Sequence, residues 1–174
     1  TIMPWYKGRV FVFFFIANVY LCPKNTVMEK QKILFVCHGN ICRSPMAEFL
    51  MKKLVKDAGR AQEFEIDSVA TSTEEIGNDM YPPAQHCLRS HGVPFEPREA
   101  RQMTQADYDY YDRIFVMDRN NLRRLHTIGI EDKEDKISLL MSLIGENREV
   151  ADPWYTRDFE KTYADLCAAL PKIL

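Results

Sequence analysis

Cys37 and Arg43 lie in the segment CHGNICRSP, with five residues between them. The apolar run KILFVC leads into this segment, and the pair Ser44-Pro45, which is typical of a helix start, ends it. We therefore expect a loop that joins a strand to a helix at the carboxyl edge of a sheet, where α/β proteins bind ligands. Successive backbone N–H groups in such a loop form a cradle for an anion such as phosphate.

The side chains of this loop suit nucleophilic attack on phosphorus. Gly39 allows a tight backbone shape, and the planar guanidinium of Arg43 can bind two phosphate oxygens at once. The same positive field is expected to lower the pKa of Cys37 below its usual value of ~8.5, which makes it a thiolate near neutral pH. A thiolate at the floor of a phosphate cradle is a nucleophile, and the hydroxyl of Ser44 can donate a hydrogen bond to it.

Other interpretations of these cysteines explain less of the pattern. A cysteine at the end of a strand is commonly just a small buried apolar residue. A zinc site built from Cys37, His38 and Cys42 lacks the usual spacing and a fourth ligand, so no metal is expected. A thioredoxin-type Cys-x-x-Cys pair is absent from the sequence. The strand, glycine, arginine and Ser-Pro pair together favour a phosphate-directed nucleophile.

The segment CHGNICRSP resembles the signature of the low-molecular-weight protein tyrosine phosphatases, and the resemblance covers about residues 30–174 in order. It continues in DSVATSTEEIGN at 67–78, ARQMT at 100–104, FVMDRNNLRRL at 115–125 and DPWYTRDFEKTY at 152–163. The segments TSTEEIGN and DPWYTRDFE are most similar to the corresponding segments of bacterial members. The resemblance implies hydrolysis of phosphotyrosine in proteins and of small aryl phosphates, without metal or cofactor, through a phosphocysteine intermediate.

The resemblance also implies roles for individual residues. Cys37 corresponds to the nucleophile, Arg43 to the transition-state clamp, and Asp152 to the general acid. Further positions hold the cradle in shape through hydrogen bonds, namely Asn40, Ser44 and Ser68. The other loop residues are expected to contact the bound phosphate, and they are His38, Gly39, Ile41 and Cys42.

The chemistry requires an acid such as Asp152 independently of the resemblance. Expulsion of a phenolate is faster when a carboxylic acid protonates it, and the resulting carboxylate can then activate water against phosphocysteine. Pro153 biases Asp152 toward an extended conformation, which suits a carboxyl presented from a loop. Trp154 and Tyr155 follow directly and are expected to form a wall against the phenyl ring of the substrate. A deep aromatic pocket reaches phosphotyrosine better than the shorter phosphoserine.

Two segments depart from the family pattern. Thr73-Glu74 replaces an aromatic residue found on the rim in vertebrate members, so we expect a different peptide preference that disfavours very acidic peptides. Pro97-Arg98-Glu99 lies where many members have a histidine in the cradle-support network, which puts that part of the network in question. Asp118 is expected to cap its helix within reach of the active-site loop.

Three alternative functions share parts of this pattern. Arsenate reductases of this fold need a further Cys-x6-Cys pair, but the residue that would pair with Cys87 is Pro94. Protein-arginine phosphatases of the family carry threonine where this loop has Ile41. A non-catalytic phosphate-binding module is disfavoured because nucleophile, arginine and acid are all present.

Cys42 has a second predicted role, as a redox partner of Cys37. The two cysteines share one tight loop, so Cys42 could capture an oxidised Cys37 as a disulfide before further oxidation. The alternative is that Cys42 merely packs under the loop, since a disulfide needs Cα atoms within ~7 Å.

The elements that must position these residues alternate between strand and helix. Strands are predicted at 32–37, 63–70, 99–102 and 113–117, with a weaker strand or strand-to-helix junction at 136–140. Helices are predicted from Ser44 as N-cap to about residue 58, and at 83–91, 104–111, 118–126 and 159–173, with loops at 71–81 and 150–157. This order predicts an α/β fold with a parallel sheet. The family resemblance implies one three-layer domain with a four-stranded sheet and the phosphate-binding loop after the first strand.

The composition fits one globular domain. The chain has 174 residues, of which 46% are hydrophobic and 28% charged. Its net charge of -2 argues against a nucleic-acid-binding protein, which normally carries a basic excess. Five cysteines are too few for a disulfide scaffold, so we expect reduced thiols and a cytoplasmic location.

Residues 1–27 differ from the rest because they contain basic residues but no acidic ones. Their apolar block at 10–22 is too short for a membrane span of ~20 residues, so stable membrane insertion is not expected. We favour an extension outside the fold, produced by an over-extended gene start before Met28, with the phosphatase domain at 28–174. The alternative is a weak secretory signal, which would imply secretion.

Overall fold

The computed structural model describes residues 29–174. The predictions for residues 1–27 lie outside the described residues, and the domain boundary at Met28 stays a prediction.

A sheet of four parallel strands forms the centre of the molecule. The strands are β1 (Gln31–Cys37), β2 (Phe64–Ala70), β3 (Arg113–Val116) and β4 (Ile137–Leu139), in the spatial order β2-β1-β3-β4. The central strand β1 is buried from Ile33 to Cys37, as expected for a continuous apolar run covered on both faces. The predicted α/β class and four-stranded parallel sheet are confirmed.

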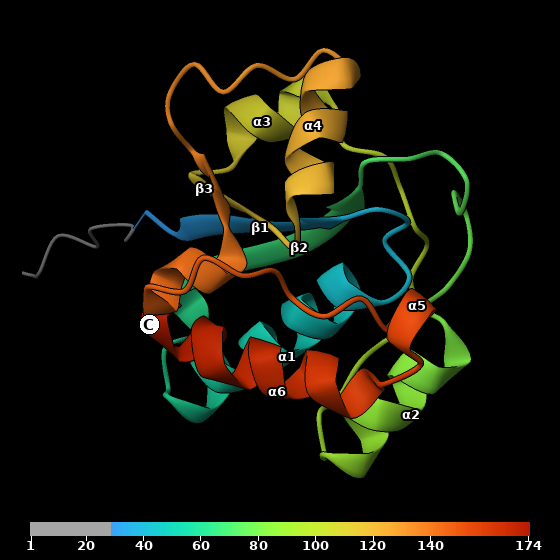
Figure 1. Ribbon diagram of the computed structural model, residues 1–174. Coiled ribbons are helices and arrows are strands. Elements are labelled where there is room, and N and C mark those ends of the chain that lie inside the picture. Colours follow the sequence, from blue (N-terminus) through green and yellow to red (C-terminus); the bar gives the residue numbers. More distant parts are fainter. Residues whose placement is uncertain (1–28) are drawn as a thin grey trace, which may run out of the picture.

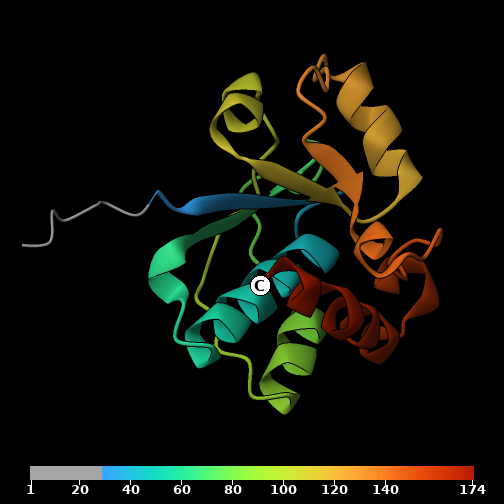
Figure 2. The same ribbon diagram turned by 90° about the vertical axis from the view of Figure 1, so that its left-hand side faces the viewer.

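Helices cover both faces of this sheet and produce three layers (Figures 1 and 2). One face carries α1 (Arg43–Asp57), α2 (Pro82–Ser90) and α6 (Phe159–Ala169), and the other carries α3 (Gln105–Tyr110) and α4 (Arg119–Thr127). Side chains of β1 alternate between the two cores, since Ile33 and Phe35 pack on the α1 side and Leu34 and Val36 on the opposite side.

Three predicted segments differ from the structure. The predicted strand at 99–102 is only a single bridge between Ala70 and Gln102, because the N–H of Ala100 bonds to the carbonyl of Asn78 in the preceding loop. The predicted loop at 150–157 contains a short helix, α5 (Pro153–Thr156), since proline is favourable at a first helical position. The last helix ends at Ala169, and Leu170–Ile173 continues as a 3₁₀ turn that contains Pro171.

Two predicted helix starts are confirmed in detail. Thr104 and Asp107 form a reciprocal capping box at the start of α3. Asp118 caps α4 by accepting a hydrogen bond from the N–H of Asn121. Among residues 29–174, no helix combines the length and apolar character needed to cross a membrane.

Candidate active site

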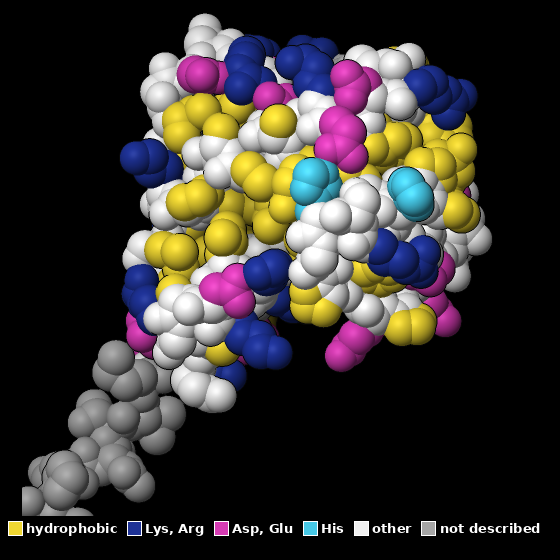
Figure 3. Space-filling model, turned by 90° about the horizontal axis from the view of Figure 1, so that it is seen from below, with side chains coloured by type: hydrophobic (Ala, Val, Ile, Leu, Met, Phe, Trp, Pro, Cys, Tyr) yellow, Lys and Arg dark blue, Asp and Glu magenta, His cyan; other side chains and the backbone are white. Residues whose placement is uncertain are grey.

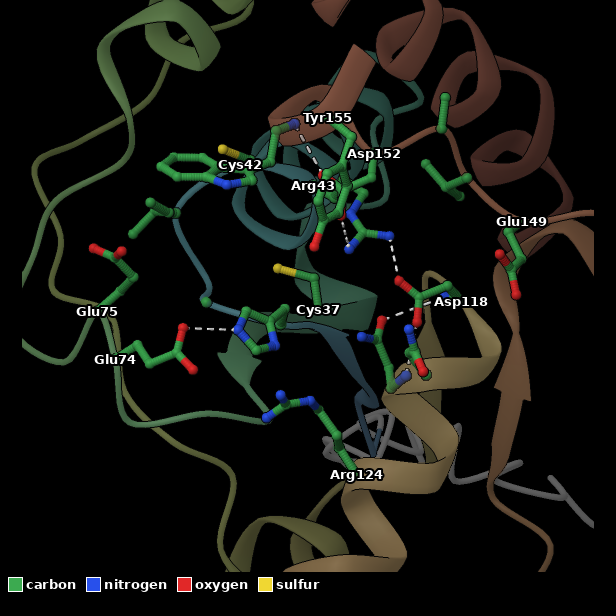
Figure 4. A pocket seen from close by; sticks show the side chains of 18 residues that line it. Cys37, Cys42, Arg43, Glu74, Glu75, Asp118, Arg124, Glu149, Asp152 and Tyr155 are labelled. Atoms are coloured by element: carbon green, nitrogen blue, oxygen red, sulfur yellow. Dashed lines mark hydrogen bonds and ion pairs between the residues drawn. The ribbon is translucent and has the colours of Figure 1, made fainter. Parts of the chain in front are cut away.

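A cavity of about 500 Å³ opens at the carboxyl edge of the sheet, where β1 turns into α1. The thiol of Cys37 points into it beneath Arg43, with Asp152 and Tyr155 on the α5 side and Asp118 and Arg124 on the α4 side (Figure 4). The structure therefore brings the predicted nucleophile and arginine, which share one loop, and the predicted acid from a distant part of the chain to one cavity.

Cys37 forms the floor of the cavity and receives two polar contacts. Its Sγ lies 3.1 Å from Oγ of Ser44, and the backbone N–H of Asn40 donates to it at 3.3 Å. The prediction that Ser44 caps the helix is wrong, because the N-cap of α1 is Cys42, two residues earlier, which makes no side-chain cap. Ser44 is thus inside the first turn, and its hydroxyl is directed at the nucleophile instead of at the helix backbone.

Asn40 holds the loop in its shape. It lies in the left-handed region with φ 58°, a conformation that asparagine tolerates better than most residues. Its amide donates at 2.9 Å to the hydroxyls of both Ser44 and Ser68. Ser68, at the end of β2, donates onward at 2.7 Å to the buried carboxylate of Glu48 on α1. The predicted supporting residues Asn40, Ser44 and Ser68 form one connected network.

Arg98 occupies the part of the network that the sequence put in question. Its guanidinium donates to the carbonyl of Asn40 at 2.8 Å, to the side-chain oxygen of Asn40 at 2.9 Å and to the carbonyl of Ser68 at 3.2 Å. Its Nε lies 3.7 Å from the carboxylate of Glu48. The sequence analysis noted Arg98 without assigning it a role and missed Glu48, although a glutamate within the helical segment 46–55 is a signal of a buried partner.

Arg43 is almost fully buried between two carboxylates. Its Nη1 lies 2.6 Å from Asp118, and its Nη2 lies 2.6 Å from Asp152. Burial by itself lowers the pKa of the guanidinium, but the charges of Cys37, Asp152 and Asp118 outweigh it and raise the pKa above the ordinary value. Arg43 is therefore a permanent cation in the site.

Asp152 projects from the start of the short helix α5. One carboxylate oxygen accepts from the N–H of Trp154 at 3.0 Å, while the other pairs with Arg43. The indole of Trp154 is half-exposed and packs on Tyr81, with ring centroids 5.7 Å apart. Tyr155 is 83% exposed on the rim. Both predicted aromatic residues line the cavity, with Trp154 held by a neighbour and Tyr155 free in solvent.

The remaining loop residues line the cavity in different ways. Ile41 and Cys42 are buried in a small cluster with Ala100. Burial and the nearby charges of Cys37 and Asp152 raise the pKa of the Cys42 thiol. At the rim, Nε2 of His38 lies 3.0 Å from the carboxylate of Glu74. A Cβ at Gly39 would lie 3.0 Å from Cγ of Glu75, so the side chain of Glu75 would have to shift to admit it.

Comparison with known proteins gives a consistent result. Residues 32–174 match the family model of low molecular weight phosphotyrosine protein phosphatase. A curated relative of that name from Gallus gallus is 41% identical over 140 residues, which are 78% of this chain and 88% of that protein. The crystal structure of YfkJ from Bacillus subtilis superposes with a TM-score of 0.78 and 31% identity, covering 83% of this chain and 92% of that chain.

A third similar protein differs in the activity that its title states. The crystal structure of a Drosophila arginine phosphatase superposes with a TM-score of 0.74 and 30% identity. It covers 82% of this chain and 94% of that chain. The fold alone therefore does not separate the two kinds of phosphatase.

The network predicts a measurable effect of Arg98→Ala. Because this change removes charged donors from Asn40 and Ser68, we expect a loss of about 2 kcal/mol in the free energy of unfolding. We also expect inorganic phosphate to bind several-fold more weakly, since the loop loses part of its support. Chemical denaturation and phosphate competition measure the two effects.

Arg123→Ala is the matched control, because Arg123 is exposed on α4 and its guanidinium bonds only to Asn120 among the described residues. It should change stability by no more than about 0.5 kcal/mol. Equal effects of the two substitutions would show that Arg98 does not support the loop.

Proposed function

Because the chain belongs to the low molecular weight phosphotyrosine protein phosphatase family, it is a phosphotyrosine phosphatase, and we propose that Cys37, Arg43 and Asp152 carry its catalysis. The observation that supports this assignment is the convergence of the three side chains on one cavity. The 2.6 Å contact between Arg43 and Asp152 joins the phosphate clamp to the acid within that cavity. No metal or cofactor is part of the proposal.

The first step transfers the phosphoryl group to the enzyme. The phosphate dianion enters the cradle and replaces the carboxylate of Asp152 at Arg43, and the released carboxylate takes up a proton from solvent. The Cys37 thiolate attacks phosphorus, the bond from phosphorus to the phenolic oxygen breaks, and Asp152 donates its proton to the leaving oxygen. The cradle N–H groups and Arg43 stabilise the charge of the transferring phosphoryl group.

The second step hydrolyses the phosphocysteine. Asp152, now a carboxylate, accepts a proton from a water molecule that attacks phosphorus. The bond from phosphorus to sulfur breaks, and Cys37 leaves as a thiolate that the Ser44 hydroxyl and the Asn40 N–H stabilise through their contacts at 3.1 and 3.3 Å. Phosphate then leaves, Asp152 gives up the proton to solvent, and its carboxylate returns to Arg43.

The walls of the cavity support an aryl phosphate in a protein as the substrate. Trp154 and Tyr155 line the cavity and directly follow the Asp152-Pro153 pair in the chain, so they can contact a phenyl ring beside the acid. Glu74, Glu75 and Glu149 add negative charge around the opening, so we propose that phosphotyrosine flanked by acidic residues is disfavoured. His38 partly offsets this charge through its contact with Glu74.

A protein-arginine phosphatase is the second candidate, because a solved structure of that activity is similar to this chain. The branched aliphatic side chain of Ile41 lines the cavity and favours the tyrosine phosphatase. The two activities are distinguished by the substrate assays below.

We also propose a reducing, cytoplasmic location and a bacterial origin. The location is supported by the need of the mechanism for a reduced nucleophile and by the absence of disulfides among the cysteines of residues 29–174. The origin is supported by the segments TSTEEIGN and DPWYTRDFE.

Substitution of the nucleophile tests the mechanism directly. Cys37→Ser should abolish turnover of an aryl phosphate, because a serine hydroxyl in this cradle is not ionised. Arg43→Ala should lower kcat/KM by at least ~10²–10³-fold, since the phosphoryl charge loses its clamp. Steady-state assays with an aryl phosphate, phosphoarginine and arsenate measure both effects and the substrate class. Turnover that survives in Cys37→Ser, or preference for phosphoarginine or arsenate, would overturn the assignment.

Asp152→Asn tests the acid. It should slow hydrolysis of phosphotyrosine by ~10²–10⁴-fold because the phenolate leaves without a proton. Substrates whose leaving group is a weak base should lose much less, and a series of substituted phenyl phosphates measures this difference. Equal losses across the series would show that Asp152 does not protonate the leaving group.

Reversible oxidation tests the proposed partnership of Cys42 with Cys37. Peroxide should inactivate the wild type, and a thiol reductant should restore most of its activity if Cys42 traps oxidised Cys37 as a disulfide. Cys42→Ser should recover much less, because Cys37 then oxidises beyond rescue. Cys167→Ser is the control, since it removes a thiol on α6. Equal recovery in all three proteins would leave Cys42 as a packing residue.

A further inference from the structure

A second group of reactive side chains lies on the face formed by α2 and α6. The Sγ of Cys87, a ring nitrogen of His91 and a carboxylate oxygen of Glu160 all lie within 4.8 Å of one another. None of the three lines the active-site cavity. Figure 3 shows this face of the molecule, where histidine side chains lie exposed beside acidic ones. The phosphatase mechanism gives these residues no role.

The fold brings the three residues together from two packed helices. Cys87 on α2 and His91 at the C-cap of that helix are four positions apart, so their side chains share one face. Glu160 lies in the first turn of α6, which packs against α2. Its carboxylate contacts both partners, with one oxygen 2.7 Å from Nε2 of His91 and the other 3.6 Å from Sγ of Cys87.

Neighbouring groups fix the orientation of these side chains. The imidazole of His91 stacks on the ring of Tyr163, with centroids 3.9 Å apart and an interplanar angle of 9°. Cys87 is buried, and its sulfur also lies 3.6 Å from the carbonyl of Phe159. Little conformational freedom therefore remains to be lost when a ligand binds to this group.

The arrangement of the three ligand atoms suits a cation. They already lie within 4.8 Å of one another, so one ion can contact all three. A divalent cation would replace the thiol proton of Cys87 and would be held between a thiolate and a carboxylate.

We propose that Cys87, His91 and Glu160 form a zinc-binding site. Thiolate sulfur, imidazole nitrogen and carboxylate oxygen are the ligands that zinc prefers, at bond lengths of about 2.0–2.3 Å. Magnesium and calcium prefer oxygen ligands only. Binding releases the thiol proton to solvent, and water completes the fourth position.

The surface offers access to the site. Cys87 and Glu160 line a depression of about 610 Å³ that also includes Pro83, His86 and Phe159. A zinc ion bound from this side would tie α2 to α6. Since α6 directly follows the α5 turn that carries Trp154, the ion would strengthen the helix pair that supports one wall of the active site.

Metal titration of the full chain tests the proposal. The experiment uses a Cys37→Ser background, because the active-site thiolate is itself a potential metal ligand. We expect one equivalent of zinc, release of a proton, a rise in the melting temperature because zinc binds the folded state, and a thiolate-to-metal absorption band with cobalt. Magnesium should produce none of these effects.

Ligand variants decide whether the three named residues bind the metal. His91→Gln and Glu160→Gln should each lower the affinity for zinc by at least roughly 10- to 100-fold. Loss of a residue that only hydrogen-bonds to a metal ligand already has an effect of this size. Both side chains are exposed, so these variants should fold even if Cys87→Ser does not. His126→Gln, on the opposite face in α4, should leave affinity unchanged. Unchanged affinity in both ligand variants, or no cobalt–thiolate band, would overturn the site.

Discussion

The left-handed backbone of Asn40 is the constraint on which the phosphate loop depends. The turn lets the N–H of Asn40 point at the sulfur of Cys37, but it places a residue with a Cβ in an unfavourable region of φ and ψ. The hydrogen bond that the Asn40 amide donates to Ser68, and those that Arg98 donates to the side-chain oxygen of Asn40 and the carbonyl of Ser68, stabilise this conformation. The loop is thus held before any phosphate binds, so little binding energy is needed to order it.

Arg43 imposes a second constraint, because a buried cation must have a partner in every state of the site. Without substrate, Asp118 and Asp152 supply two carboxylates at 2.6 Å. Asp118 is also the cap of α4 and is fixed by that role, whereas Asp152 lies on a short helix at the cavity rim. The phosphate therefore displaces Asp152 more easily than Asp118, and it does so at the moment when a protonated carboxyl is required.

The parts of the site that adjoin one another in sequence could be predicted from it, and the parts that meet across the fold could not. The strand, the loop from Cys37 to Ser44 and the following helix follow from local patterns. The identity of the acid followed from a family resemblance. The roles of Glu48 and Arg98 could not be predicted, because their buried polar network joins α1, β2 and a distant loop. The spacing of residues within one helix or strand does not show such contacts. The start of α1 was placed two residues too late because its N-cap, Cys42, makes no side-chain cap, whereas the predicted contact of the Ser44 hydroxyl with Cys37 is present.

The cradle and the acid are anchored to different helices, which gives them different freedom. The cradle is bonded to α1 and β2 through Ser68 and Glu48. Ala151, which precedes the acid, is bonded to α6 instead. Its N–H donates to the carboxylate of Asp165 at 2.9 Å, and its carbonyl accepts from the hydroxyl of Thr162 at 2.8 Å. These bonds fix the backbone next to Asp152 while its carboxyl stays at the cavity rim. Proton transfer then needs only a side-chain rotation away from Arg43, and the cradle does not have to change shape during the cycle.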